Sequence, residues 1–543
     1  MKKKCFLILF FVNLIMNAQS INWEWAKSFG SNNLDKSNSL AVDSNSNTYT
    51  IGRFYGSSIT FEGSQSINNN GQSDVFLTKH DASGNLVWAK VIGGLSNDYG
   101  FGVTTDQNDN VLVTGCYLSQ TLTIGSTTLA GTNNTRTFVA KYNSSGDLIW
   151  AKKFNDFSQG NSITTDSNGN VFVIGNFSGT NVAFENIVLT SNGSTDIFIA
   201  KLDSNGNMIF CKSFGGSGEE SGNFIKVNSL GNIFVTGSFS SASVSFDSVT
   251  VNKFGSGQLG DFFLTKLDSS GTTLWAKGAG GYGNNWDIGY GITTDDSDNA
   301  YVISEFCSAA INVGGYQLSN SFAGNNNTFI AKYTSNGTVS WVKNLALSQN
   351  GGFCITSDND GNIYVASNFG GQINLDSATI NFNGGYDIFI VKYNNLGSFQ
   401  WATSVGGPTW DYAYGIDLNS SNDLFITGSV VDDNTAFGNT ILNNSLTKHM
   451  YVAKLTQSNL SNEPFLLNNL GIQLVPNPAH NEINIKGINS KSLIKIHNEQ
   501  GKIVVDQEAI TDLRLDIKNL QKGIYFISIQ SEKNIEIRKL IIE

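Results

Sequence analysis

A phrase of the type Trp-Ala-Lys returns along most of the chain at nearly constant spacing. It begins at Trp25, Trp88, Trp150, Phe210, Trp275, Trp341 and Trp401, with gaps of 60 to 66 residues. A fixed period of this length is typical of repeat architectures, whose units cannot bury their apolar faces alone. The 543 residues therefore contain seven repeat units rather than three or four independent domains.

Each unit contains four strand-like runs, which in the third unit cover 162–166, 170–175, 196–202 and 208–214. Short turns that contain Gly, such as Asp-Ser-Asn-Gly-Asn at 203–207, predict hairpins between the first and second runs and between the third and fourth. The second run is apolar on both faces, so both faces of its sheet must be covered. Radial stacking of like sheets achieves this in a β-propeller, and a linear solenoid is the alternative.

The two ends of the repeat array complement each other. The last unit has a third run at 450–454 but no fourth, whereas an unpaired run at 23–27 precedes the first complete unit. We expect these two runs to pair, because the pairing removes the free sheet edge of an open array. The sequence thus predicts an all-β fold in which residues 19–460 form a seven-bladed β-propeller closed by its N-terminal strand.

Three stretches carry a family resemblance: Tyr290-Gly-Ile-Thr-Thr-Asp295, Gly361-Asn-Ile-Tyr-Val-Ala366 and Ile197-Phe-Ile-Ala-Lys201. In these stretches, and through their repetition over residues 23–458, the chain resembles the bacterial β-propeller repeat family. The resemblance implies the propeller fold and no single activity.

The N-terminus predicts export from the cytoplasm. Three lysines precede an apolar run at 6–16 and the residues Asn-Ala-Gln, which indicates a signal peptide over residues 1–18 and use of the Sec machinery. No later run is long enough to predict a transmembrane segment. Cys116, Cys211, Cys307 and Cys354 form no CxxC pair and are expected to be buried thiols. The net charge of −11 argues against nucleic-acid binding.

The composition changes near the C-terminus. Three of the four prolines, Pro464, Pro476 and Pro478, lie close together and predict a linker at 461–471. Residues 472–543 then carry 19 charged side chains, well above the 14% of the whole chain. Short alternating runs, such as Glu-Ile-Asn-Ile-Lys at 482–486, predict a small β-sandwich in this segment.

Four phrases occur in order in this segment: Val475-Pro-Asn-Pro478, Ile494-Lys-Ile-His-Asn-Glu-Gln-Gly-Lys502, Leu520-Gln-Lys-Gly-Ile-Tyr-Phe526 and Lys539-Leu-Ile-Ile542. They resemble the C-terminal sorting domain of the type IX secretion system of Bacteroidetes. The resemblance implies passage across the outer membrane by the type IX machinery, so the protein is expected to be secreted or held at the outer cell surface. The implied signal residues are Pro476, Asn477, Pro478, Gly501, Gly523, Tyr525 and Lys539. An ordinary accessory β-domain is the alternative.

An acidic position recurs at the start of the innermost strand of each unit. It reads Asp35, Asp98, Ser158, Glu220, Asp287, Asn350 and Asp411. Around a propeller these acids would approach one rim of the channel, where Asp35 and Glu220 could contribute to a cation site such as one for Ca²⁺. The alternative, which we favour, is that each acid accepts backbone N–H bonds in its own loop. No cofactor is predicted.

Departures from the repeat indicate a candidate ligand site. Trp286 and Trp410 directly precede two of the acids, Asp287 and Asp411. The remaining candidate residues near the same ends of their strands are Asp98, Tyr99, Tyr290 and Tyr412, and Tyr414 lies nearby. Aromatic faces beside polar groups suit a glycan or a peptide, and packing between blades is the alternative. The lysines that end the third strands, such as Lys79, are expected to lie in solvent.

The chain has no evident catalytic constellation. No Ser/His/Asp set and no HExxH spacing is present, so no catalytic residue is assigned. The sequence favours a secreted or cell-surface binding scaffold with an extracellular glycan or protein partner. A polysaccharide-active enzyme that uses carboxylates at the channel mouth is the first alternative, and a purely structural surface protein is the second.

Overall fold

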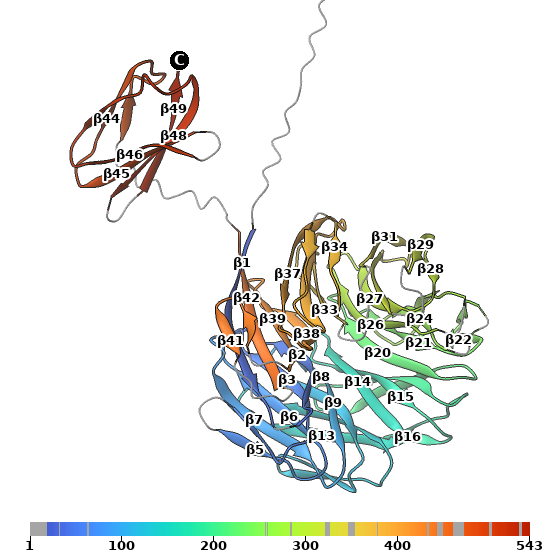
Figure 1. Ribbon diagram of the computed structural model, residues 1–543. Helices are drawn as coiled ribbons and strands as arrows, with labels where there is room; N and C mark the ends of the chain where they lie inside the picture. The colour runs from blue at the N-terminus through green and yellow to red at the C-terminus, as the bar shows by residue number, and fades with distance from the viewer. Residues whose placement is uncertain are drawn as a thin grey trace, which may run out of the picture. The chain divides into compact units, whose positions relative to one another are not determined.

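The computed structural model describes residues 19–543, except for 32, 62–64, 256, 258, 283–284, 321–325, 346–352, 377, 432–433, 443–448, 460–471, 499–501 and 532–534. In this described part every helix or strand is a β-strand, which confirms the all-β prediction. The chain divides into two compact units, one covering Ile21–Gln457 and the other containing Ser458–Glu543 (Figure 1). The predicted signal peptide at 1–18 and linker at 461–471 lie outside the described residues.

The larger unit repeats one antiparallel four-strand plan, and seven such sheets are present in its described part. The innermost strands are β2 (Lys36–Val42), β8 (Asp98–Thr105), β14 (Ser158–Thr165), β20 (Glu220–Val227), β26 (Asp287–Thr294), β32 (Phe353–Ser357) and β38 (Tyr412–Leu418). The second strands are β3 (Thr48–Phe54), β9 (Val111–Tyr117), β15 (Val171–Phe177), β21 (Ile233–Phe239), β27 (Ala300–Phe306), β33 (Ile363–Phe369) and β39 (Leu424–Val430).

The outer half of each sheet consists of a third and a fourth strand. The third strands are β6 (Asp74–His80), β12 (Arg136–Tyr142), β18 (Asp196–Leu202), β24 (Asp261–Leu267), β30 (Asn327–Tyr333), β36 (Asp387–Tyr393) and β42 (His449–Asn459). The fourth strands are β7 (Leu86–Gly93), β13 (Leu148–Asp156), β19 (Met208–Phe214), β25 (Thr273–Ala279), β31 (Val339–Asn344), β37 (Phe399–Val405) and β1 (Gln19–Phe29). Second and third strands such as β9 and β12 are buried at every residue, because neighbouring sheets cover both of their faces.

A small hairpin connects the second strand of each sheet to the third. These hairpins are β4 (Ser58–Thr60) with β5 (Ser66–Asn68), β10 (Thr121–Ile124) with β11 (Thr127–Ala130), β16 (Val182–Phe184) with β17 (Ile187–Leu189), β22 (Ser243–Phe246) with β23 (Val249–Asn252), β28 (Ala310–Val313) with β29 (Tyr316–Ser319), β34 (Ile373–Leu375) with β35 (Ala378–Ile380), and β40 (Thr435–Phe437) with β41 (Thr440–Leu442). The hairpin β10–β11 also pairs with β7 of the preceding sheet.

The innermost strands follow one another in a cycle. β2 contacts β8, the contacts continue through β14, β20, β26 and β32 to β38, and β38 contacts β2 again (Figure 1). This arrangement of like sheets is propeller-like. The first strand completes the last sheet as the sequence predicts, because β1 lies beside β42 in the same sheet as β38 and β39. The Thr456 hydroxyl donates to Asn22 O at 3.1 Å across this pair.

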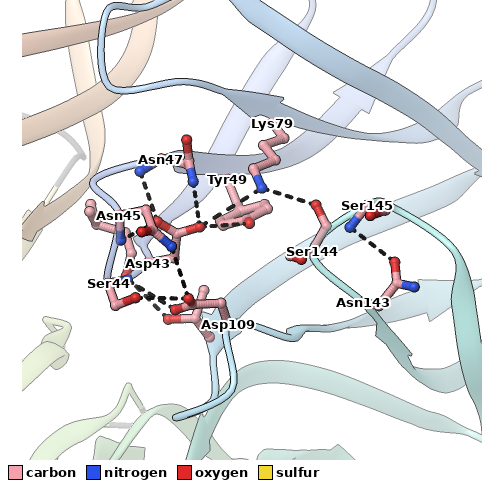
Figure 2. Close-up of polar contacts among 12 residues, drawn as sticks. Asp43, Ser44, Asn45, Asn47, Tyr49, Lys79, Asp109, Asn143, Ser144 and Ser145 are labelled. Atoms are coloured by element: carbon pink, nitrogen blue, oxygen red, sulfur yellow. Dashed lines mark hydrogen bonds and ion pairs between the residues drawn. The ribbon is translucent and has the colours of Figure 1, made fainter.

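A shared acceptor in a turn holds several of the sheets to the next one. Ser144 O, in the turn before β13, accepts a bond of 2.9 Å from Lys79 Nζ (Figure 2). It also accepts one of 3.2 Å from Trp88 Nε1. Ser204, Ser335 and Asn395 carbonyls each accept the corresponding Lys and Trp pair in later sheets. The expectation that these lysines lie in solvent is wrong, because the neighbouring sheet covers them and Lys79 is only 8% exposed.

Glycine allows this turn to approach the Trp ring. Gly146 has a φ of +82°, and a β-carbon there would lie 3.0 Å from the Trp88 ring. Side chains within the turns also hold them, and the turn between β2 and β3 is an example. Asp43 accepts bonds from the backbone N–H groups of Asn45 and Asn47, both at 2.9 Å, and from the Tyr49 hydroxyl at 2.9 Å (Figure 2). These Asp-Ser-Asn turns are thus held by their own side chains.

The smaller unit contains two sheets around one hydrophobic core. The first sheet contains β43 (Gln473–Val475), β44 (Glu482–Lys486) and β47 (Leu513–Asp516), and the second contains β45 (Ser492–His497), β46 (Ile503–Ala509), β48 (Gly523–Ser531) and β49 (Ile535–Ile542). Ile483 and Leu515 of the first sheet join Ile494 and Ile527 of the second in the same buried cluster.

Candidate functional site

The acids that open the innermost strands are buried in their own loops. Asp98 is 0% exposed. Its carboxylate accepts bonds from Gly94 N at 2.8 Å, from Leu118 N at 3.2 Å and from the Ser119 hydroxyl at 2.8 Å. Asp287 likewise accepts bonds from the backbone N–H groups of Gly281 and Cys307. Each acid therefore joins two loop segments, which is the alternative that we favoured from the sequence.

The acids do not form the shared acidic rim that we considered from the sequence. Asp35, Asp98, Glu220, Asp287 and Asp411 are each at most 1% exposed, so none presents a carboxylate to a ligand in the channel mouth. The described residues include no group of three or more His, Cys, Asp or Glu side chains that could hold a metal ion. The acids lie apart because each belongs to the interface of a different pair of sheets. Asn350 lies outside the described residues.

A second acid accompanies several of these buried carboxylates. Asp74 begins β6 and is buried near Asp98 of the next sheet. Burial and the neighbouring Asp98 charge raise the pKa of Asp74 to about 7, and burial raises that of Asp98 to about 6. Asp261 and Asp287 form a similar pair, in which burial raises the pKa of Asp261 to about 7. The carboxyl groups of these pairs therefore keep their protons to a higher pH than exposed carboxyl groups do.

The centre of the larger unit contains a cavity of about 240 Å³ that all seven innermost strands line. A β-bulge in these strands adds one residue at the position of Asn38, Phe101, Asn161, Asn223, Tyr290 or Tyr414, and these residues line one layer of the cavity. The amides of Asn161 and Asn223 each donate to a carbonyl of the following sheet at 2.9 Å. Tyr290 bonds to Glu305, whose pKa burial raises to about 7.

An aromatic–cationic patch lies across the β38, β2 and β8 strands and their neighbours. We define it by Tyr386, Trp410, Tyr412, Tyr414, Lys36, Arg53, Tyr55 and Tyr99. The rings of Tyr412 and Tyr414 stack at 5.8 Å, and Lys36 Nζ lies 4.1 Å from the Tyr414 ring centre. Arg53 lies 4.9 Å from the Tyr99 ring centre and 5.7 Å from that of Tyr55.

The two predicted tryptophans are partly packed and partly exposed. Trp410 is 54% exposed and Trp286 is 38% exposed. Each covers a glycine of the preceding sheet, because a β-carbon at Gly385 or Gly260 would lie 2.3 or 2.9 Å from the respective ring. Trp410 pairs with Tyr386 through the backbone, which places it in the patch. Trp286 and Tyr290 belong to a different sheet, so the structure does not gather all the candidates at one place.

Four members of the patch were not predicted from the sequence. Lys36, Arg53, Tyr55 and Tyr386 come from two sheets, and no motif marks them. The available signal was that Arg53 departs from the small or neutral residues at the same position of sister strands, such as Cys116, Asn176 and Ser238.

The predicted sorting residues join the beginning and the end of the smaller unit. The Asn477 amide donates to Lys539 O at 2.7 Å, and Asn477 Oδ1 accepts from Ile541 N at 2.9 Å. Pro476, Pro478 and Lys539 are exposed. Gly523 begins β48, and the buried Tyr525 donates its hydroxyl to Gln521 O at 2.9 Å. Gly501 lies outside the described residues.

Comparison with known proteins identifies this segment. Residues 473–543 match the family model described as the secretion system C-terminal sorting domain. The match confirms the predicted sorting domain of type IX secretion, which directs the protein to the cell surface or the extracellular space. Among the described residues, no helix has the length and apolar character needed to cross a membrane.

The repeat region has a weaker relative. An uncharacterised WD repeat-containing protein of Acanthamoeba polyphaga mimivirus is 24% identical over 509 residues, which include 75% of this chain and 36% of that protein. The chain thus spans about a third of the length of this relative, whose name is consistent with a repeated propeller-like fold.

Solved structures give only distant similarities. PorZ, a surface component of the type IX secretion system of Porphyromonas gingivalis, is 9% identical with a TM-score of 0.17, covering 95% of this chain and all of that one. The Synechocystis apocarotenoid oxygenase is 8% identical with a TM-score of 0.35, covering 81% of this chain and 96% of that one. At such TM-scores neither similarity supports an argument about function.

Proposed function

We propose that the protein is a binding scaffold of the cell surface or the extracellular space whose aromatic–cationic patch binds a glycan. Its export by the type IX route rests on the sorting domain at 473–543. In this proposal the chain is exported by the Sec machinery, and residues 1–18 are removed as its signal peptide. The type IX machinery of a member of the Bacteroidetes then recognises the tail. A protein ligand is the other outcome that the test below distinguishes.

The proposal includes the finer architecture. The seven four-stranded sheets and the cycle of innermost strands support a closed seven-bladed propeller of the bacterial repeat type over residues 19–460. The two sheets that share one core in the smaller unit support a β-sandwich over residues 472–543.

The patch is the observation that supports glycan binding. Stacked tyrosines and a half-exposed Trp410 offer apolar faces on which the C–H groups of a sugar ring can stack. Lys36 lies over the Tyr414 ring and Arg53 over the Tyr99 ring, and both supply hydrogen-bond donors for hydroxyl or acidic groups of the ligand. The burial of the acids argues against an enzyme that uses them, because a carboxylate enclosed by backbone N–H groups cannot reach a glycosidic oxygen.

Trp410 and Trp286 provide a matched pair for the test. Both rings cover a glycine of the preceding sheet, but only Trp410 belongs to the patch. A glycan array with the mature protein would first identify a glycan, and titration calorimetry would then compare Trp410→Ala, Arg53→Met and Trp286→Ala.

We expect the two patch variants to weaken binding at least tenfold, as loss of one stacked ring or one charged donor would. Trp286→Ala should retain the affinity of the original protein. No glycan binding by the original protein, or equal affinity in all three variants, would refute the proposal. Capture of a protein through the same patch would replace the glycan by a protein ligand.

A further inference from the structure

Two charged residues interrupt one neutral layer of the central cavity. The sixth residue after the acidic position reads Ala41, Thr104, Thr164, Lys226, Thr293, Thr356 and Asp417 around the seven innermost strands. All seven residues line the cavity. The threonines show that the repeat tolerates a small neutral side chain here, so the propeller-like fold does not require Lys226 or Asp417.

The two charges belong to opposite sides of the cycle. Lys226 is on β20 and Asp417 is on β38, with β26 and β32 between them in one direction and β2, β8 and β14 in the other. They are close enough for Lys226 to lower the pKa of Asp417, although burial has the larger, opposite effect. Both residues are within the described part of the chain, where they form no direct ion pair with each other.

The Asp417 carboxylate is held rigidly at the wall. Its Oδ2 accepts a bond of 2.9 Å from Val42 N, and its Oδ1 accepts one of 2.9 Å from Leu418 N. These two bonds satisfy only part of the capacity of a carboxylate, which can accept about four. An opposite charge is strongly attracted to such a group inside a protein, where the effective dielectric constant is far below that of water.

We propose that the central cavity binds a small zwitterion of the free amino acid class, with its carboxylate toward Lys226 and its ammonium group toward Asp417. A ligand with both charges compensates the two wall charges at once, whereas a simple anion or cation compensates one and leaves the other without an opposite charge. Threonine hydroxyls of the same layer, including Thr164 and Thr293, can bond to either end of the ligand.

The size of the cavity limits the ligand. Its volume of about 240 Å³ equals that of roughly eight molecules of liquid water, at about 30 Å³ each. This suits a small amino acid and is too small for an oligosaccharide. Phe101, Tyr290 and Tyr414 line the other layer of the cavity and would meet a short apolar side chain. The site shares Tyr414 with the patch proposed for glycans, but its two charged residues, Lys226 and Asp417, lie outside that patch.

Titration calorimetry of the mature protein with alanine tests the proposal, with propionate and ethylamine as probes that each carry one of the two charges. We expect alanine to bind at least tenfold more tightly than either single-charge probe. Lys226→Thr and Asp417→Thr place the residue of the sister strands at each position, and each should weaken alanine binding at least tenfold. Trp286→Ala, which lies outside the cavity and keeps both charges, is a control and should change the affinity less than threefold.

The double variant Lys226→Thr/Asp417→Thr distinguishes loss of the binding site from misfolding, which could affect the single variants. It leaves no isolated charge in the cavity, so it should keep the far-ultraviolet circular dichroism and the unfolding midpoint of the original protein within a few degrees, without binding alanine. Absence of alanine binding by the original protein would overturn the proposal. So would alanine binding that persists in the double variant, or propionate binding as tight as alanine binding.

Discussion

Substitution of Trp88 and of Trp401 by phenylalanine, one at a time, tests the way in which successive sheets are joined. The two side chains are equally buried, each 8% exposed. Trp88 Nε1 donates to Ser144 O in the turn between the third and fourth strands of the next sheet. Trp401 Nε1 is buried and, in the described structure, has no hydrogen-bond partner. The next sheet there takes its third and fourth strands, β42 and β1, from opposite ends of the repeat region, so no such turn exists.

The expected difference follows from the two donors. Both substitutions remove the same ring atoms from equally buried positions, so the loss of packing is similar. Trp88→Phe also removes a hydrogen bond with a net contribution of about 1 kcal/mol, whereas Trp401→Phe removes a buried donor whose lack of a partner costs about 1–3 kcal/mol. We therefore expect Trp88→Phe to be the less stable variant, by about 2 kcal/mol or more in the free energy of unfolding.

Scanning calorimetry and urea unfolding of the mature protein measure this difference. For a unit of this size the unfolding temperatures should differ by roughly 2–4 °C. Trp275→Phe is a matched control, since Trp275 is buried like Trp88 and its Nε1 donates to Ser335 O at 3.0 Å. It should behave like Trp88→Phe. Equal destabilisation by Trp88→Phe and Trp401→Phe, or a larger effect of Trp401→Phe, would refute the reasoning.

Two further predictions concern the buried acid pairs and the tail. Folding raises the pKa of Asp74 to about 7 and that of Asp98 to about 6, so the folded state keeps protons that the unfolded state releases near pH 4. The stability that these protons contribute is complete below about pH 4 and is lost as the pH rises through about 7. The urea midpoint of the original protein should therefore fall between pH 5 and pH 8, and that of Asp74→Asn should fall less. Parallel plots of midpoint against pH for the two proteins would contradict the assignment. In the tail, Asn477→Ala removes both bonds to β49. It should speed hydrogen exchange of the Ile541 amide roughly fivefold, because the lost bond to that amide contributes about 1 kcal/mol. Asn484→Ala, which removes a single bond to Val475 O, should leave that amide unchanged, and equal effects of the two variants would exclude the proposed link.

The strand plan could be predicted because it is encoded by local patterns. Apolar runs of fixed period mark the strands, and turns such as Asp-Ser-Asn-Gly-Asn mark the hairpins. The pairing of the first strand with β42 was also predictable, since the two incomplete ends of the array could satisfy only each other. The sorting domain was recognisable from short phrases that remain contiguous in the sequence.

The depth of polar side chains was not predictable, because it depends on the neighbouring sheet. Lys79 ends a strand and looked exposed, but the next sheet covers it and supplies Ser144 O as its acceptor. Asp98 and Asp411 looked available to a ligand, but the loops of adjacent sheets enclose them. The candidate site was therefore only partly correct, with Trp410, Tyr412 and Tyr99 in one patch and Trp286 in another sheet.

By itself, the sequence determined the repeat, its strands, its closing partner and its export signal, all of which depend on patterns within about 65 residues or on the ends of the array. Tertiary structure alone decided which residues that differ from the repeat pattern lie in the same cavity. Lys226 and Asp417 are 191 positions apart in the chain, yet both line the same small cavity. The physical reason is that a cyclic array of sheets converts one position of each repeat into one layer of the central cavity, where charges from distant units interact.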